Sequence, residues 1–173
     1  MSETNLPIIG SLEKVSIGKH KNVPAKIDTG ADSTSVWASD IRVTPDGVLE
    51  FSLFAPGSKY YNGKTIRRKH FTAVVVRSAT GEEQIRYRTQ LTFSIAGKRI
   101  KVMCSLSDRS RNHMPILIGR RTISKKFLVD VSRKSVKRPK PNEKTSVLQQ
   151  LLSEDPFKFH QEYVELARKG NQL

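Results

Sequence analysis

The sequence predicts an all-β domain that closes into a barrel or sandwich, followed by a basic linker and C-terminal helices. Up to Val131, short segments alternate apolar and polar residues with period two, and turn-forming residues separate them. After Val131 the chain becomes strongly basic and contains prolines, a composition that cannot bury a core. Apolar residues then recur at helical spacing. We therefore expect a β-barrel domain at residues 1–132 and a linker with a helical tail at residues 133–173.

The predicted strands are short and follow one another at the spacing that is typical of sandwiches and barrels. Asn62 and Gly63 form a strong turn signal, and the segments at 79–82 and 96–98 are expected to close hairpins. We expect strands at residues 12–17, 23–27, 35–43, 48–54, 71–77, 84–91, 91–95, 99–105, 115–119 and 127–131.

The C-terminal tail contains two signals for helix starts. Ser146, with Gln149 three residues further on, forms a capping-box pattern. Asp155 precedes Pro156, as an N-cap precedes a proline at the first helical position. We expect a pair of helices that dock on the barrel or on a partner. The linker before them contains the basic residues Arg133, Lys134, Lys137, Arg138, Lys140 and Lys144.

The charge of the chain points to anionic partners. Lys and Arg total 31 against 16 Asp and Glu, which gives a net charge of +15. Such a field favours nucleic acid, ribosomes, anionic membrane surfaces or acidic peptides, although it can also serve solubility alone. No apolar run approaches the length of a membrane helix, and the N-terminus lacks a secretory signal pattern. With a single cysteine, Cys104, these features predict a cytoplasmic protein without an internal disulfide.

The turn Asp28-Thr29-Gly30-Ala31 is the most informative segment of the chain. A strand delivers Asp28 at its end, Thr29 can form a local hydrogen bond, and Gly30 permits a tight turn close to the carboxylate. Aspartic peptidases need two carboxylates roughly 3 Å apart that share one proton and activate a water. Asp28, Thr29 and Gly30 are therefore the candidate catalytic residues. Taken alone, such a triplet is more often a plain β-turn.

A second element strengthens this interpretation. The run Ile-Leu-Ile-Gly-Arg at residues 116–120 resembles the hydrophobic-hydrophobic-glycine element that packs beside the Asp-Thr-Gly turn in retroviral-type aspartic proteases. Since the chain contains one such turn, a complete dyad of carboxylates requires a homodimer in which each subunit contributes Asp28. The alternative is a monomeric barrel in which Asp28 only caps a turn.

Together these motifs resemble a bacterial family of retropepsin-like proteins that are named as ATP-dependent zinc proteases. Members of that family accompany the ligase that adds glutamates to a ribosomal protein. The resemblance implies a closed retropepsin-like barrel, a homodimer, and an aspartic-type endopeptidase that trims glutamate-rich peptide tails. It covers the chain from Ile8 to Arg133 and leaves out the basic tail. The residues that carry it lie at 25–35, 76–82, 106–110, 114–120 and 127–130.

Several basic residues are candidates for binding an acidic substrate. Lys26 lies two positions before Asp28 on a strand, so both side chains point to the same face. Its ammonium group would lower the pKa of Asp28, which opposes the sharing of a proton between two carboxyls. Lys26 could instead bind a glutamate side chain of the substrate. The alternative to both roles is an exposed lysine at the edge of the sheet. Arg109 offers a bidentate fork for a carboxylate, against the alternative of a solvated arginine. The other candidate substrate-binding residues are Ala31, Arg77 and Arg120, and Arg86, Arg88 and Arg121 are further candidates, each with a solvated surface arginine as the alternative.

The residues do not support the zinc and ATP in the family's name. The histidines His20, His70, His113 and His160 are widely separated, Cys104 stands alone, and no His-Glu-x-x-His motif is present. No phosphate-binding loop of the Gly-x-x-x-x-Gly-Lys type is present either. We therefore expect no metal site and no cofactor.

An alternative function is a non-catalytic basic module that binds RNA or the ribosome, or that regulates a partner ligase. Basic residues interleave with aromatic ones at residues 59–61 and 67–71. Salt-dependent RNA binding without peptidase activity would favour this alternative over the peptidase.

Overall fold

We describe the chain from a computed structural model. It describes residues 6–77, 81, 83–137 and 143–165. The chain divides into two compact units, Met1–Lys137 and Arg138–Leu173, each of which is described by itself.

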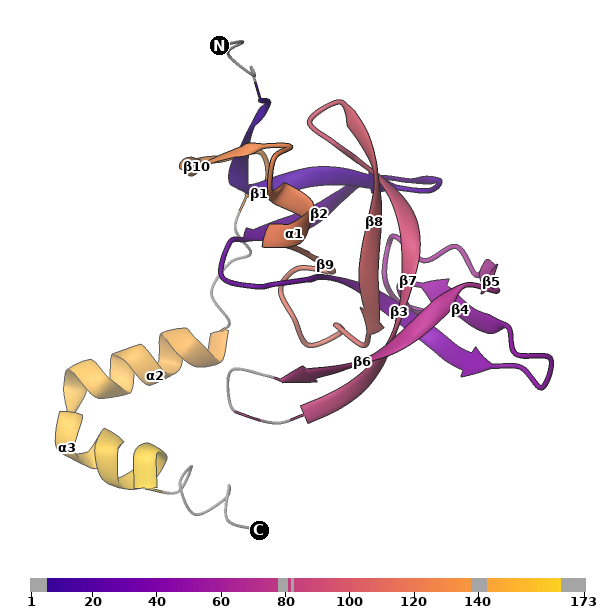
Figure 1. The fold of residues 1–173 in the computed structure, drawn as a ribbon. Coiled ribbons are helices and arrows are strands. Elements are labelled where there is room, and N and C mark those ends of the chain that lie inside the picture. Colours follow the sequence, from indigo (N-terminus) through magenta and orange to yellow (C-terminus); the bar gives the residue numbers. More distant parts are fainter. Residues whose placement is uncertain (1–5, 78–80, 82, 138–142, 166–173) are drawn as a thin grey trace. The chain divides into compact units, whose positions relative to one another are not determined.

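The first unit is a closed β-barrel with additional strands (Figure 1). Six strands form the ring in the order β1-β2-β9-β3-β8-β7, and β1 closes it by pairing with β7 from Val15 opposite Ile95 to Ile17 opposite Phe93. This confirms the predicted all-β barrel. The strands are β1 (Ile8–Ile17), β2 (His20–Asp28), β3 (Thr34–Val43), β4 (Leu49–Leu53), β5 (Thr65–Arg68), β6 (Phe71–Arg77), β7 (Glu83–Ile95), β8 (Lys98–Ser107), β9 (Ile116–Gly119) and β10 (Leu128–Lys134).

Four strands lie outside the ring. β10 extends the sheet beyond β1, β6 extends it beyond β7, and β4 and β5 form a ribbon on β3. The sequence pattern missed β5, because its four residues are mostly polar and it pairs only with β4. It also divided β7, which is one continuous strand. β10 ends at Lys134, two residues beyond the expected end of the barrel domain.

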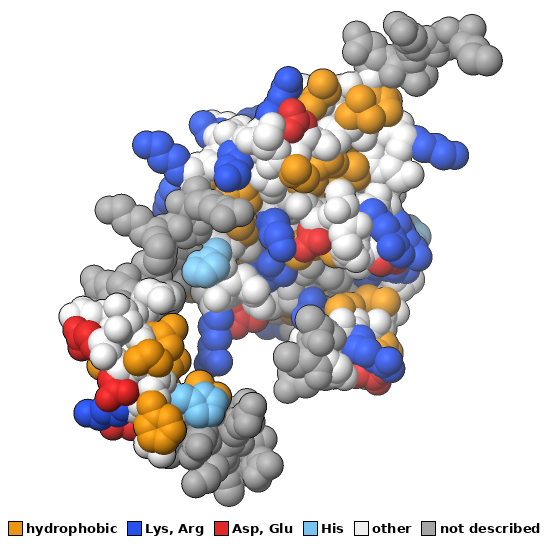
Figure 2. All heavy atoms as spheres, turned by 90° about the vertical axis from the view of Figure 1, so that its left-hand side faces the viewer, with side chains coloured by type: hydrophobic (Ala, Val, Ile, Leu, Met, Phe, Trp, Pro, Cys, Tyr) orange, Lys and Arg blue, Asp and Glu red, His pale blue; other side chains and the backbone are white. Residues whose placement is uncertain are grey.

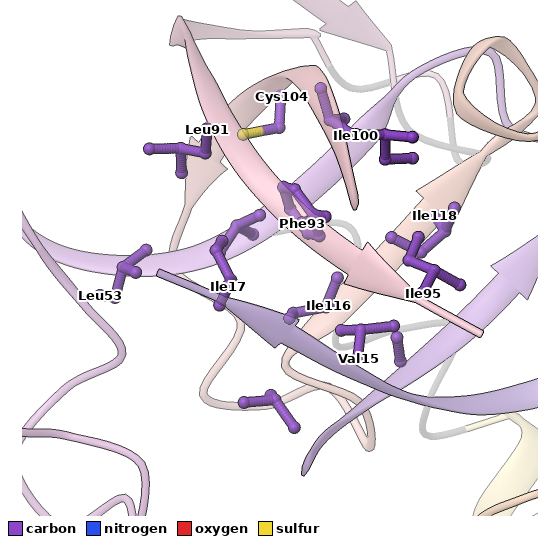
Figure 3. Packing of buried hydrophobic residues seen from close by; sticks show 14 of the residues in the cluster. Val15, Ile17, Leu53, Leu91, Phe93, Ile95, Ile100, Cys104, Ile116 and Ile118 are labelled. Atoms are coloured by element: carbon purple, nitrogen blue, oxygen red, sulfur yellow. The ribbon is translucent and has the colours of Figure 1, made fainter. Parts of the chain in front are cut away.

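The core fills the barrel with side chains from nearly every strand (Figure 3). Phe93 of β7 lies among Ile17 of β1 and Ile116 of β9, and all three are almost completely buried. Burying each such side chain contributes about 1.5–3 kcal/mol. β9 sits between β2 and β3 in the sheet order, which explains its uninterrupted apolar sequence. This placement brings the end of β9 beside the end of β2.

The second unit is helical, with α2 (Glu143–Glu154), α3 (Pro156–Phe159) and a π-helical turn, η1 (His160–Glu165). The predicted cap at Asp155 is confirmed, because its Oδ1 accepts a hydrogen bond of 3.0 Å from the Lys158 N–H. The predicted start at Ser146 was wrong: α2 begins at Glu143, since Glu and Lys are good helix formers and nothing interrupts the chain there. Within the described residues, no helix is long and apolar enough to cross a membrane.

Candidate active site

Strand β2 presents Asp28 at its last position. β2 runs parallel to β9, with Asp28 opposite Gly119 and Lys26 opposite Leu117. Ala25 and Ile27 are buried in the barrel, and the alternation of a strand therefore turns Lys26 and Asp28 to the outer face. The predicted shared face of these two side chains is confirmed.

The Asp28 carboxylate is held from two sides. Its Oδ1 accepts hydrogen bonds of 3.2 Å each from the backbone N–H groups of Gly30 and Ala31. The Ala31 N–H also lies 3.2 Å from the Asp28 carbonyl oxygen, so it is shared between two acceptors. Oδ2 faces the Lys26 ammonium at 3.0 Å. The carboxylate is thus oriented by the turn, while its side chain keeps 25% exposure.

The pKa of the Asp28 carboxyl lies below its ordinary value. The hydrogen bond from Lys26 is the largest cause; partial burial opposes it, and the Lys26 charge and the Gly30 and Ala31 N–H groups lower the pKa further. The ionised form is therefore favoured in a single subunit. The stability that Asp28 contributes is present above its unfolded pKa and is lost as the pH falls through the folded pKa.

Thr29 and Gly30 form the exposed part of the turn. Among the described residues the Thr29 hydroxyl forms no hydrogen bond, so the expected local bond is not present. Gly30 does not have a positive φ, and a Cβ there would meet only Asp28 Oδ1, at 3.4 Å. What Gly30 provides is its backbone N–H close to the carboxylate.

Gly119 packs directly against the loop that follows the turn. A Cβ at Gly119 would lie 2.4 Å from the carbonyl oxygen of Ser33, which leaves no room for any other residue. The Gly119 N–H donates to the Thr34 hydroxyl at 3.1 Å, and that buried hydroxyl also bonds the Thr122 hydroxyl at 2.8 Å. The glycine of the second motif thus fixes the position of the first.

The short helix α1 (Arg120–Ile123) holds the same loop by its first residues. The Arg120 N–H donates to the Ala31 carbonyl at 2.8 Å, and the Arg121 N–H donates to the Asp32 carbonyl at 3.2 Å. The Asp32 carboxylate pairs with Arg120 at 3.2 Å and with Arg121 at 2.9 Å. The predicted substrate residue Arg120 therefore lies near the turn, with its guanidinium already bound to Asp32.

The structure brings together Lys26, Asp28, Gly30, Ala31 and Arg120, but it gives Arg77 and Arg109 other partners. Arg77, on β6, pairs with Glu83 across the β6–β7 hairpin. Arg109 lies half-buried after β8, where its Nε–H donates to the Met114 carbonyl at 3.2 Å.

A second arginine lies close to Arg109. Burial lowers the pKa of the Arg109 guanidinium, and the like charge of Arg86 lowers that pKa further. The side chain of Arg86 donates from Nε and Nη2 to Gln84 Oε1, and within the described residues it forms no ion pair. Two cations thus lie near each other at this place.

Three features of the site were not predicted from the sequence. They are the hydrogen bond of Thr122, the Asp32–Arg121 ion pair, and the effect of the Arg86 charge on Arg109. Each depends on residues far apart in the chain that only the fold brings together, and no local pattern marks them. Among the described residues, no three His, Cys, Asp or Glu side chains are grouped so that they could hold a metal ion. No step of the chemistry is therefore assigned to zinc.

Comparisons with known proteins agree with this architecture. The profile of the RimB-like family, described as "Retropepsin-like aspartic endopeptidase RimB", matches residues 8–140. A search of curated proteins found no match. The crystal structure of a protein of unknown function from Legionella pneumophila is similar, with a TM-score of 0.59 and 24% identity over 74% of this chain and 95% of that one. At that identity the likeness shows the fold alone.

Proposed function

This chain belongs to the RimB-like family of retropepsin-like aspartic endopeptidases, and we propose that it hydrolyses peptide bonds as a homodimer with one Asp28 from each subunit. The observation that carries the proposal is the Asp28 carboxylate, oriented by two backbone N–H groups in an exposed turn. One such carboxylate is half of an aspartic dyad.

In the proposed dimer, the two Asp28 carboxyls share one proton and hold a water between them. The ionised carboxylate takes a proton from the water as it attacks the peptide carbonyl, and the protonated carboxyl supports the developing oxyanion. Oδ1 stays bound to Gly30 and Ala31 N–H, which fixes the carboxyl plane during the reaction.

The surface of the single subunit supports a partner copy. Thr29 and Gly30, beside the proposed catalytic carboxylate, are exposed. The edge strand β10 exposes the side chains of Leu128 and Val131, at 54% and 73%. An open strand edge with apolar side chains is a site for pairing with another chain, and a second copy would cover it.

Lys26 links the dyad to an acidic substrate. In one subunit its ammonium group neutralises Asp28, which opposes proton sharing. The Lys26 side chain is 55% exposed and can turn toward a carboxylate of the substrate. That movement would raise the pKa of Asp28 and so favour the shared proton when an acidic peptide is bound.

Replacing Lys26 by methionine should raise the pKa of Asp28, because the largest cause of its lowering is removed. An NMR titration of the Asp28 carboxyl measures this, and the acidic limb of the activity profile should move to higher pH. Lys21→Met, which removes an exposed lysine from the same strand, should leave both unchanged. An unchanged Asp28 titration in Lys26→Met would contradict the assignment.

Arg86 and Arg109 are further candidate groups for glutamate side chains. The charge of Arg86 acts on Arg109, and a carboxylate bound there offsets this repulsion and gains charge-assisted hydrogen bonds. Lys and Arg side chains are spread over the barrel side seen in Figure 2, with fewer Asp and Glu among them. The proposed substrate is accordingly an acidic peptide, such as a glutamate-rich tail added to a ribosomal protein in the cytoplasm.

Replacing Arg86 by methionine should raise KM for an acidic peptide about tenfold or more, the effect of losing a hydrogen bond to a charged group. The value of kcat should change less, because Arg86 does not contact the reacting atoms. Arg77→Met is the matched control, since that guanidinium is already paired with Glu83. Equal KM values in the two variants would exclude Arg86 from substrate binding.

Cleavage of matched peptides tests the proposed function. A peptide with an oligoglutamate extension and the same peptide with an oligoglutamine extension are incubated with the protein, and the products are identified by mass spectrometry. We expect cleavage of the glutamate peptide and little of the glutamine peptide. Cleavage of neither would reject the proposed substrate class.

A further inference from the structure

The outer face of β7 and β8 carries a basic groove, one end of which reaches Ser33 in the loop after the catalytic turn. On β8, Val102 and Cys104 point into the barrel, while Lys101 and Met103 alternate with them and are exposed. Met103 lies opposite Gln90 of β7 in the antiparallel pair. These outward side chains form the floor of the groove.

Two hollows lie along this face. One has a volume of about 220 Å³ between β8 and α1, and its cations are Arg88, Lys101, Arg121 and Lys126. The other has a volume of about 560 Å³ and is lined by Lys69, His70, Phe71 and again Arg88. Arg88 and Met103 line both, so the two hollows are neighbours. Among the described residues, no Asp or Glu lines either of them.

Most of these cations have no acidic partner within the described part of the chain. Arg121 pairs with Asp32, but Lys69, Lys101, Lys126 and Arg88 form no ion pair there. The Nε–H of Arg88 is buried and forms no hydrogen bond to the protein. The rest of the Arg88 side chain lines both hollows and is free to bind an anion there.

We propose that this groove binds single-stranded nucleic acid, with phosphates on the cations and bases against Phe71 and Met103. Three lysines and two arginines line it, and both kinds of side chain bind phosphate, lysine as a point charge and arginine through its fork. Apolar and aromatic side chains between cations give bases a surface to stack on. Asp28 lines neither hollow, although Ser33 of the following loop lines one of them.

Fluorescence anisotropy with a labelled single-stranded RNA of about 12 nucleotides, within the site sizes of such proteins, tests the proposal. The double variant Lys101→Met/Lys126→Met removes two cations from the groove. The double variant Lys19→Met/Lys64→Met removes two exposed cations elsewhere on the barrel unit, so the net charge is matched. We expect the groove variant to lose at least tenfold in affinity and the control to change less than twofold.

The dependence on salt gives a second readout. Five phosphate contacts, one for each lysine and arginine that lines the groove, predict a slope of log K against log salt of about −3.5. The groove variant loses two of these contacts, so its slope should be about −2. Lys101→Arg/Lys126→Arg, which keeps both charges, should retain binding. Thermal melting checks that every variant is folded.

Three outcomes would overturn the proposal. Equal losses in the two methionine double variants would mean diffuse binding over the basic surface. Tighter binding of an oligoglutamate peptide, in competition with RNA, would make the groove a site for acidic peptides. Equal or tighter binding of a duplex RNA of the same sequence would exclude recognition of a single strand. None of these outcomes depends on peptidase activity.

Discussion

Replacing Asp28 by asparagine should lower kcat on an acidic peptide by about a thousandfold or more, since an amide cannot take the proton from the attacking water. The fold should remain, because the asparagine oxygen still accepts the hydrogen bonds from Gly30 and Ala31 N–H. Losing the exposed pair with Lys26 should change the free energy of unfolding by less than about 1 kcal/mol. Steady-state kinetics with a thermal melt measures both.

The matched control is Asp46→Asn. Asp46 is an exposed carboxylate, paired with Arg67 at 3.8 Å in the same unit, and has no part in the proposed chemistry. It should keep full activity. Activity in Asp28→Asn comparable to that of Asp46→Asn would rule out the aspartic mechanism, whatever the fold.

Replacing Gly119 by alanine should destabilise the barrel by about 3 kcal/mol, the upper range for forcing an atom into a packed site. The added Cβ would lie 2.4 Å from the Ser33 carbonyl oxygen and 2.8 Å from the Ser33 nitrogen, and both are backbone atoms that cannot move aside alone. The loop after Asp28 must shift, so activity should fall as well. Urea unfolding with parallel kinetics measures the two effects.

Gly30→Ala is the control for Gly119→Ala, because it replaces a glycine of the same site without a steric clash. Its Cβ would meet only Asp28 Oδ1, at an ordinary contact distance of 3.4 Å, and its φ is not positive. The free energy of unfolding should therefore change by less than about 1 kcal/mol. If Gly119→Ala proves as stable as Gly30→Ala, Gly119 does not fix the loop as described.

The fold could be predicted from the sequence because buried and exposed residues alternate along the strands of the barrel. β1 and β2 alternate buried and exposed residues, and the uniformly apolar β9 lies inside the sheet between β2 and β3. β5 was not predicted because its mostly polar residues show no strand pattern, and it forms by pairing with β4. The start of α2 was misplaced because the helix extends through Glu143 and Lys144, two good helix formers that precede the capping pattern at Ser146.

For the site, the sequence pattern predicted only the contacts that lie within a single strand. The position of Lys26 relative to Asp28 follows from the alternation of β2, and the structure gives a contact of 3.0 Å. The Thr34–Thr122 hydrogen bond, and the approach of Arg86 to Arg109, depend on the closing of the barrel. Thr29 was expected to bond locally, but its side chain lies in the exposed part of the turn.

The central claim is that Asp28 of two subunits forms one catalytic dyad. A crystal structure of the homodimer measures it directly, as the distance between the nearest carboxylate oxygens of the two Asp28 side chains. We expect about 3 Å, the separation at which two carboxyls share a proton. Asp28 carboxylates tens of ångströms apart, in an assembly that cleaves peptide, would contradict the claim.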